Sequence, residues 1–335
     1  MNTRIFLGIN WSKHNSGGLV TGLVIQFQTP GKIKTIKFNQ LIMKCILTII
    51  LACFSYSVAG QTSAKDYRPY FQIASYATYK LKTGSPDDYI HIMKSLATEY
   101  KQFPLDYPKL GALLFEKDTS SALSYMGLAI SKGYSLGSLQ NHFEKEEDKE
   151  YIEEKLNDKY IQFLNQRNND FVIFLESLIK TDQLYRAETF GLPDSIRYIK
   201  QDSIDLRNLM MLKSKIEQYG WPSYSMVGSD YAGVAFIVVL HGTRQFAPDS
   251  EVFQFFESLL LNELKSGNFS PISFSNWIDQ YYSVYQKLEQ PYGSMANAKG
   301  VLYPINDIEE CNRNRFSIGL PPLSEHLLLT GYRLN

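Results

Sequence analysis

The chain has 335 residues, of which 34 are basic and 34 acidic, so its formal net charge at pH 7 is zero. This balance argues against binding to nucleic acid or to an anionic membrane, since either function normally requires a basic excess. Hydrophobic residues make up 44% and aromatic residues 14% of the chain, which is enough to bury the core of one large domain or two ordinary ones.

The N-terminal region predicts an export signal. No acidic residue precedes Asp66, and the segment MKCILTIILACFSYSVAGQ, residues 43–61, combines a charged Lys44, a short apolar run and small residues near its end. That order is typical of a signal peptide over residues 43–60. Residues 1–42 are then an upstream extension, which is left out of the fold prediction. The apolar run is shorter than the about 20 residues of a membrane-spanning helix.

The same segment also contains a second export pattern. Ile50 to Cys53 (ILAC) resembles a lipoprotein signal in which Cys53 carries the acyl group. A lipid anchor at Cys53 is therefore the alternative to a free periplasmic or secreted protein. In either case the mature chain keeps Cys311 and at most one other cysteine, which argues against an internal disulfide framework. We expect the protein to be stabilised by its hydrophobic core, with no transmembrane helix in the mature chain.

Helical periodicity after the signal predicts an all-α protein of two domains. Residues 61–167 predict a helical-hairpin domain; in the segment DDYIHIMKSLATEYKQF, for example, Tyr89 and Met93 share one helical face. The lengths and spacing of these short helices, with Ala, Gly and Tyr at their contacts, are weakly similar to those of tetratricopeptide repeats. Residues 168–335 predict a compact α-helical domain with at most a short β element, at VLYPI.

One helix of the C-terminal domain is apolar on every side. Ser229 or Asp230 is predicted to cap its start, and it is predicted to end at a single histidine, His241; its composition places it in the middle of the domain. The helix before it is predicted over about residues 203–219. Gly220 and Pro222 stop that helix, and Trp221 between them is expected to anchor the turn in the core.

Known catalytic signatures give little help. The sequence has no phosphate-binding glycine loop, no His-Glu-x-x-His and no Cys-x-x-Cys. Its histidines lie far apart and lack the spacing of metal ligands. We therefore predict no metal site and no cofactor.

An ordered set of motifs nevertheless runs from about Asn168 to Leu329: DQLYR, YGWP, the histidine after an apolar helix, QPYG and NRFSIGLPPL. This set resembles an uncharacterised bacterial domain family that is known only as a domain of unknown function. The resemblance implies membership of that family without an assigned activity, and it does not include the N-terminal helices. It places the family's recurring polar residues at Asp182, Gln183, Arg186, Asn208, His241, Gln254, Asp279, Gln290, Tyr292 and Arg315.

The chain departs from the family pattern in two places. Gln280 stands where the family usually has arginine, and Ser294-Met295 stands where Thr-Gln is typical. These departures remove a cation and an amide, so the resemblance leaves open whether an ancestral activity survives.

Two of these residues are candidates for catalysis. His241 has the side chain of a general base near neutral pH, although a histidine at a helix end can also simply bond a carbonyl. Asp279 lies among aromatic residues, where burial would raise its pKa and favour acid–base work; alternatively it accepts a tyrosine hydroxyl proton.

The remaining candidates would bind a ligand. Arg186 could hold a carboxylate or a phosphate group, or it could pair with Asp182, which lies four residues earlier on the same helix. The full set of candidate binding residues is Arg186, Asp182, Gln254, Gln290, Tyr292 and Arg315.

Two functions follow from these observations. In the first, His241, Arg186, Asp279 and Tyr292 line one pocket of an exported protein and hydrolyse a substrate that carries an anionic group. In the second, the protein is a non-enzymatic protein-binding or scaffold module of the cell envelope, since stacked helical hairpins commonly bind proteins.

Overall fold

The computed structural model divides into two compact units, Met1–Ala64 and Lys65–Asn335. In the first unit it describes residues 4–13, 19–29 and 32–38, and in the second it describes residues 65–100, 106–186 and 193–334. The predicted signal peptide at 43–60 and the predicted acylation site, Cys53, lie outside the described residues.

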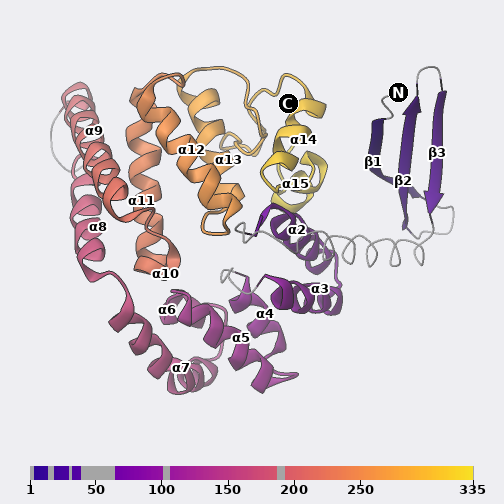
Figure 1. The fold of residues 1–335 in the computed structure, drawn as a ribbon, viewed down its shortest axis with the longest axis horizontal. Coiled ribbons are helices and arrows are strands. Elements are labelled where there is room, and N and C mark those ends of the chain that lie inside the picture. Colours follow the sequence, from indigo (N-terminus) through magenta and orange to yellow (C-terminus); the bar gives the residue numbers. More distant parts are fainter. Residues whose placement is uncertain are drawn as a thin grey trace, which may run out of the picture. The chain divides into compact units, whose positions relative to one another are not determined.

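The first unit contains a three-stranded antiparallel sheet in the order β1-β2-β3 (Figure 1). Its strands are β1 (Arg4–Lys13), β2 (Leu19–Thr29) and β3 (Lys32–Phe38). Leu7 lies opposite Ile25 in the first pair, and Ile25 lies opposite Ile36 in the second. The sheet falls within residues 1–42, which the sequence analysis left out of the fold prediction.

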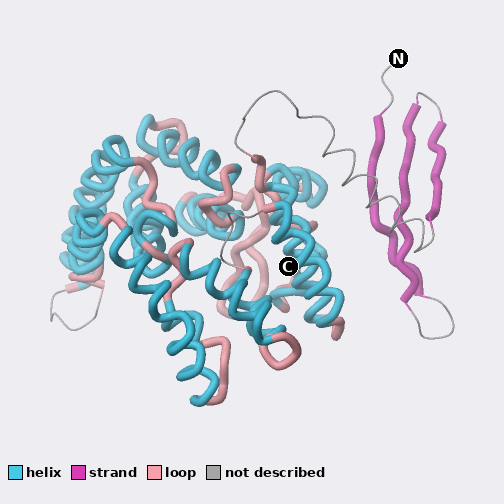
Figure 2. The backbone as a smooth tube through the Cα atoms, turned by 60° about the horizontal axis from the view of Figure 1, so that its bottom comes forward, coloured by secondary structure: helices cyan, strands magenta, loops and turns pink. Residues whose placement is uncertain are grey.

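The described part of the second unit is helical, which confirms the all-α prediction for this unit (Figure 2). In its N-terminal half the helices are α2 (Arg68–Lys82), α3 (Pro86–Glu99), α4 (Tyr107–Leu114), α5 (Thr119–Ser131), α6 (Leu136–Gln140) and α7 (Glu146–Gln166). Helix α2 packs on α3 and α4 on α5, but the likeness of these pairs to tetratricopeptide repeats is not confirmed.

The C-terminal half continues in the same way. Its helices are α8 (Asn169–Asp182), α9 (Asp194–Tyr219), α10 (Tyr224–Val227), α11 (Ser229–Gly242), α12 (Glu251–Lys265), α13 (Pro271–Gln280), α14 (Ile308–Ser317) and α15 (Leu323–Thr330), with a 3-10 turn η2 (Thr243–Gln245) and a π-helical turn η3 (Tyr281–Tyr285). At the predicted β element, Val301 and Leu302 form only isolated bridges, to Arg333 and Ala296. None of the described helices is both long enough and apolar enough to span a membrane.

One hydrophobic core runs through most of the second unit. It includes Tyr70 and Met93 from the predicted hairpin domain, and Leu175, Val238 and Trp277 from the predicted C-terminal domain. The boundary predicted at residues 167 and 168 therefore falls inside one compact unit with a shared core. Trp221, with 4% of its surface exposed, belongs to this core as predicted.

Three predicted helix starts differ from the structure. Helix α9 begins at Asp194, well before residue 203. For α13 the sequence predicts a start at Ser273 or Ser275, but the helix begins at Pro271, because Ser270 accepts the first-turn amide hydrogen bond from Ser273. Helix α11 begins at Ser229, but Gly228 is its N-terminal cap and no side chain caps it. A proline thus begins α13 and a glycine caps α11, where the sequence suggested serine or aspartate.

Helix α11 explains how the C-terminal half is held together. It packs against both α8 and α9, which is why its buried residues, such as Ala235, Val238 and Val239, are apolar. At its last residue, Gly242, a β-carbon would lie 2.6 Å from the β-carbon of Leu209 and 3.0 Å from the carbonyl oxygen of Asp205. The absence of a side chain at Gly242 therefore sets how closely α11 approaches α9.

This close approach predicts opposite effects for two glycines of one helix. Gly242→Ala should destabilise the protein by about 1–3 kcal/mol, because the added methyl group overlaps α9. Gly233→Ala is the matched control, because nothing lies within 4 Å of its β-carbon position. It should stabilise the protein by about 0.5–1 kcal/mol through lower chain entropy in the unfolded state. Urea unfolding of both variants measures the difference, and equal effects at the two positions would contradict the packing described.

Candidate functional site

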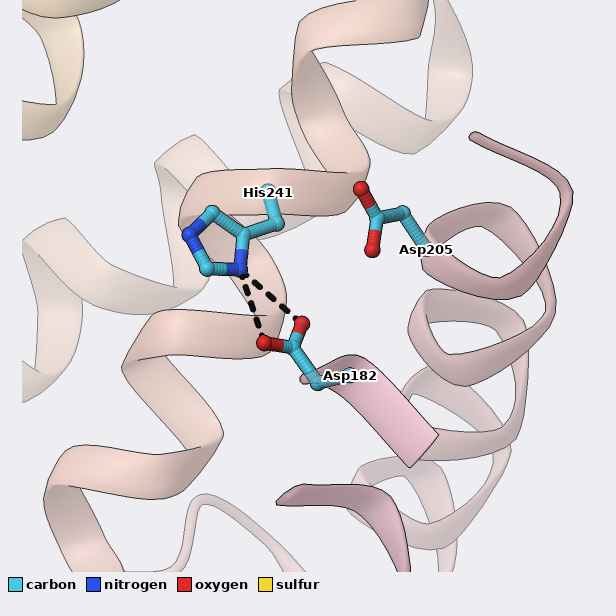
Figure 3. A group of neighbouring side chains, drawn as sticks. All are labelled: Asp182, Asp205 and His241. Carbon is cyan, nitrogen blue, oxygen red and sulfur yellow. Dashed lines mark hydrogen bonds and ion pairs between the residues drawn. The ribbon is translucent and has the colours of Figure 1, made fainter. Parts of the chain in front are cut away.

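A buried carboxylate joins the ends of two helices. Asp182 is the last residue of α8, and His241 lies in the last turn of α11. The His241 Nδ1 atom lies 2.9 Å from Oδ1 and 3.1 Å from Oδ2 of Asp182 (Figure 3). The Asp182 side chain is fully buried, whereas 21% of the His241 side chain is exposed. A carboxylate that faces Nδ1 favours a proton on that atom, which leaves Nε2 as the basic nitrogen of the neutral ring.

A second buried carboxylate, Asp205 of α9, lies beside the first (Figure 3). Arg186 connects the two: its Nε atom lies 3.3 Å from Asp182 Oδ2, and its Nη2 atom donates to Asp205 Oδ1 at 2.7 Å. Arg244, just after α11, donates to Asp205 Oδ2 at 3.0 Å and also pairs with Asp202. Two guanidinium groups therefore balance the charges of the two buried carboxylates.

Polar side chains of α8 and α9 complete this network. Gln201 donates to the backbone oxygen of Asp182 at 2.7 Å and to Asp205 Oδ1 at 2.6 Å. Asn208 Oδ1 accepts from Thr181 at 3.1 Å. Since Gln201, Asp205 and Asn208 follow one another at intervals of four and three residues, they share one buried face of α9.

The surroundings of Asp182 and Arg244 stabilise their charged forms. Burial raises the pKa of Asp182, but the hydrogen bonds and charges of His241 and Arg186 more than offset it, so the pKa is lowered. Burial lowers the pKa of Arg244, and the Asp205 and Asp202 carboxylates reverse this, so the pKa is raised. Paired in this way, the fully buried Asp182 can remain ionised without contact with bulk water.

Asp182, Asp205 and His241 also offer oxygen and nitrogen atoms that lie within 4.8 Å of one another, close enough to share a cation. These atoms already have partners, because Arg186 binds both carboxylates and His241 Nδ1 faces Asp182. A metal ion at this place would have to displace the guanidinium groups. We therefore treat the cluster as an ion-pair network.

The other predicted catalytic residue, Asp279, belongs to a separate group. It is fully buried near the end of α13, and its Oδ1 accepts the backbone N–H of Tyr292 at 2.8 Å. Its Oδ2 accepts the backbone N–H and the hydroxyl of Ser294, at 2.6 and 2.7 Å. Asp279 thus fixes the loop that follows η3 through backbone amides, where the sequence analysis suggested a tyrosine hydroxyl as partner. Burial raises its pKa to about 6, although the bonds from Ser294 and Tyr292 act in the opposite direction.

Gln290 and Arg315 hold the same loop. Gln290 donates to the carbonyl oxygens of Met295 and Tyr303 and accepts from the N–H of Met295. Arg315 is fully buried and donates to the carbonyl oxygens of Pro321 at 2.7 Å and Tyr292 at 2.6 Å. Burial lowers its pKa to about 10. All of these bonds are to the backbone, so their evident effect is to shape the loop.

The predicted site residues therefore form two hydrogen-bonded groups. Asp182, Arg186 and His241 make one, while Asp279, Gln290, Tyr292 and Arg315 make the other. Within the described residues no hydrogen bond or ion pair joins the first group to the second. The single pocket expected from Arg186, His241, Asp279 and Tyr292 thus gains no support from these contacts. Gln254 is exposed on α12, and among the described residues its side chain has no hydrogen bond to either group.

The two departures from the family pattern have simple local roles. Ser294 provides the hydroxyl that bonds Asp279, as a threonine could. Met295 bonds Gln290 through its backbone, which any residue can supply. Gln280 donates to the Tyr285 hydroxyl at 3.4 Å. None of these contacts touches Asp182 or His241.

The sequence also contains a nucleophile-type pattern that the sequence analysis missed: Gly133 to Gly137 reads Gly-Tyr-Ser-Leu-Gly. In hydrolases this pattern exposes a serine between a strand and a helix. Here it joins α5 to α6, and Ser135 is the N-terminal cap of α6, where its hydroxyl accepts the N–H of Ser138 at 3.2 Å. We therefore interpret Ser135 as a capping residue.

Asp205, Gln201 and Arg244 were missed too, for another reason. The predicted start of α9 at residue 203 excluded Gln201, and no motif includes Asp205 or Arg244. A usable signal was present: polar residues at 201, 205 and 208 repeat at helical spacing beside the apolar Leu209 and Leu212.

Comparison with known proteins identifies no relative of this chain. The chain matches no family model, no curated protein and no solved structure. The resemblance to a domain of unknown function therefore stays a prediction that rests on the motifs alone.

The raised pKa of Asp279 predicts a pH effect on stability. Because its pKa is near 6 in the folded state and 3.8 in the reference state, the folded protein binds this proton more tightly. The contribution of the group to stability is therefore greatest below about pH 4 and is lost as the pH rises to about 6. The amide that Asp279→Asn introduces cannot titrate. The difference in unfolding free energy between wild type and Asp279→Asn should move in favour of wild type as the pH falls across this range; parallel profiles in urea unfolding would contradict it.

Proposed function

We propose that the protein is a hydrolase in which His241, oriented by Asp182, acts as the general base that activates water. The observation that carries the proposal is the pairing of the fully buried Asp182 with the Nδ1 atom of a histidine that is 21% exposed. In Figure 3 the second ring nitrogen of His241 is turned away from both carboxylates. A basic nitrogen that is held in one tautomer, on a ring that is partly exposed, meets the geometric requirement for a general base.

The chemistry needs only water and a substrate with a polarised carbonyl or phosphoryl group. Water attacks that group while Nε2 takes one of its protons, and the new oxygen–carbon or oxygen–phosphorus bond forms. Asp182 stabilises the positive imidazolium that results. The proton then passes from Nε2 to the leaving group as the scissile bond breaks, and His241 returns to its neutral form.

Arg186 is the residue best placed to bind the substrate in this proposal. Its Nε and Nη2 atoms are engaged with the buried carboxylates, while Nη1 has no hydrogen-bond partner among the described residues and 22% of the side chain is exposed. The N–H groups of Nη1 could donate to a substrate oxygen that becomes negative in the transition state.

The place of this activity is part of the proposal. Residues 43–60 support export to the periplasm or the medium, and Cys53 supports a lipoprotein as the alternative. N-terminal sequencing of the mature protein separates these outcomes: a start at Gln61 supports a free exported protein, an acylated Cys53 supports a lipoprotein, and an intact Met1 would overturn export.

The test uses His241→Asn. The asparagine amide can still donate to Asp182 from about the position of Nδ1, but it has no basic nitrogen, so it separates catalysis from stability. We expect wild type to hydrolyse at least one of p-nitrophenyl acetate, p-nitrophenyl phosphate and bis(p-nitrophenyl) phosphate. His241→Asn should lower kcat/KM by about 100-fold or more, with a melting temperature near that of wild type.

His91→Asn is the matched control, because His91 is exposed on α3. It should leave hydrolysis unchanged. Equal rates for wild type and His241→Asn would overturn the role of His241. An absence of turnover with all three probes would instead favour the non-enzymatic scaffold function.

A further inference from the structure

The outer face of α9 carries an apolar seam. Ile196, Ile199, Leu206 and Met210 are 44%, 66%, 38% and 44% exposed, although side chains of this kind are usually buried. The opposite face of the helix packs inward through Asn208, Leu209 and Leu212. In Figure 1, α9 lies at the edge of the second unit beside α8. The seam is therefore an apolar surface that no described part of the chain covers.

The spacing of the seam is that of a helix pair. Ile196, Ile199, Ser203, Leu206 and Met210 follow one another at intervals of three and four residues, which corresponds to positions a, d, a, d and a of a heptad. These positions form a stripe narrower than the broad apolar face of a membrane-surface helix. Such a stripe fits the side chains of one partner helix.

The charges beside the seam suggest what the partner is. Asp202 is at position g, and Arg207 is at position e of the next heptad. In a parallel pair of identical helices, the residue at position g of one helix faces the residue at position e of the partner helix that comes five residues later in the sequence. Asp202 of each helix would therefore face Arg207 of the other, once on each side of the seam. An antiparallel pair would instead bring Lys200 beside Arg207, which is unfavourable. The Asp202 side chain is 48% exposed, although it also pairs with Arg244.

We propose that the α9 seam binds α9 of a second copy of this chain, forming a parallel two-fold dimer. A seam from Ile196 to Met210 is about 21 Å long at 1.5 Å per residue. This contact is smaller than a standard interface of about 1,600 Å², so the dimer is weak and dissociates at micromolar concentrations. The buried carboxylates Asp182 and Asp205 of the ion-pair network do not lie in the seam, and only Asp202, which pairs with Arg244, belongs to both, so the dimer does not require the proposed hydrolase activity.

The proposal is tested by sedimentation velocity of the full chain between about 1 and about 100 µM, where a weak dimer of this kind dissociates. Wild type should pass from monomer to dimer in this range. Ile199→Glu should raise the dissociation constant by about 100-fold or more, because it places two charges in the seam. Arg207→Glu should raise it by about 10-fold, because it places like charges opposite Asp202.

Ile173→Glu is the matched control, because Ile173 is 63% exposed on α8, outside the seam. It should dimerise like wild type. A wild type that is monomeric at every concentration would overturn the proposal, as would a dimer that survives Ile199→Glu. A monomer that binds vesicles containing anionic lipid, and loses that binding in Ile199→Glu, would assign the seam to a membrane surface instead.

Discussion

The arrangement of the C-terminal half depends on one buried charge, the carboxylate of Asp182. A carboxylate without exposed surface is costly unless other groups replace its water, and here His241 and Arg186 do so from α11 and from the segment after α8. The need to satisfy Asp182 therefore fixes where α8 ends and which way the last turn of α11 faces. The buried carboxylate of Asp205 also needs hydrogen-bond donors, which Arg186, Arg244 and Gln201 provide. Helix α9, which carries Asp205, is therefore part of the same network.

The contact between Asp182 and His241 serves both the stability of the fold and the proposed catalysis. A carboxylate that holds Nδ1 of a histidine stabilises the fold, and it also leaves Nε2 as a base with a fixed direction. The close contact at Gly242 supports both, since it brings the end of α11 against Asp205 and Leu209. A catalytic pair differs from a structural one in that Nε2 accepts a proton from water. The partial exposure of the His241 side chain favours this catalytic role.

Local sequence signals predicted the elements better than the site. The all-round apolar composition of α11 predicted a central position, and α11 packs against both α8 and α9. The four-residue spacing of Asp182 and Arg186 made their ion pair one of two predicted alternatives, and the structure contains that pair. His241 was expected at a helix end and lies in the last turn of α11. By contrast, Asp205 and Arg244 could not be assigned, since their contacts join residues 19 and 39 positions apart and arise only when three helices pack together. Asp279 was correctly expected to have a raised pKa, but its partners were not foreseen, because backbone amides of a loop leave no mark in the sequence.

The tautomer of His241 is the property on which the proposed activity rests most directly. Long-range proton–nitrogen correlation NMR of the ¹⁵N-histidine-labelled protein reports which ring nitrogen carries the proton, and the spectrum of His241→Asn identifies the signal. The structure predicts that neutral His241 carries its proton on Nδ1, and that Asp182→Asn removes this preference. A proton on Nε2 of neutral His241 in the wild-type protein would contradict the account, because the ring would then present no base to water.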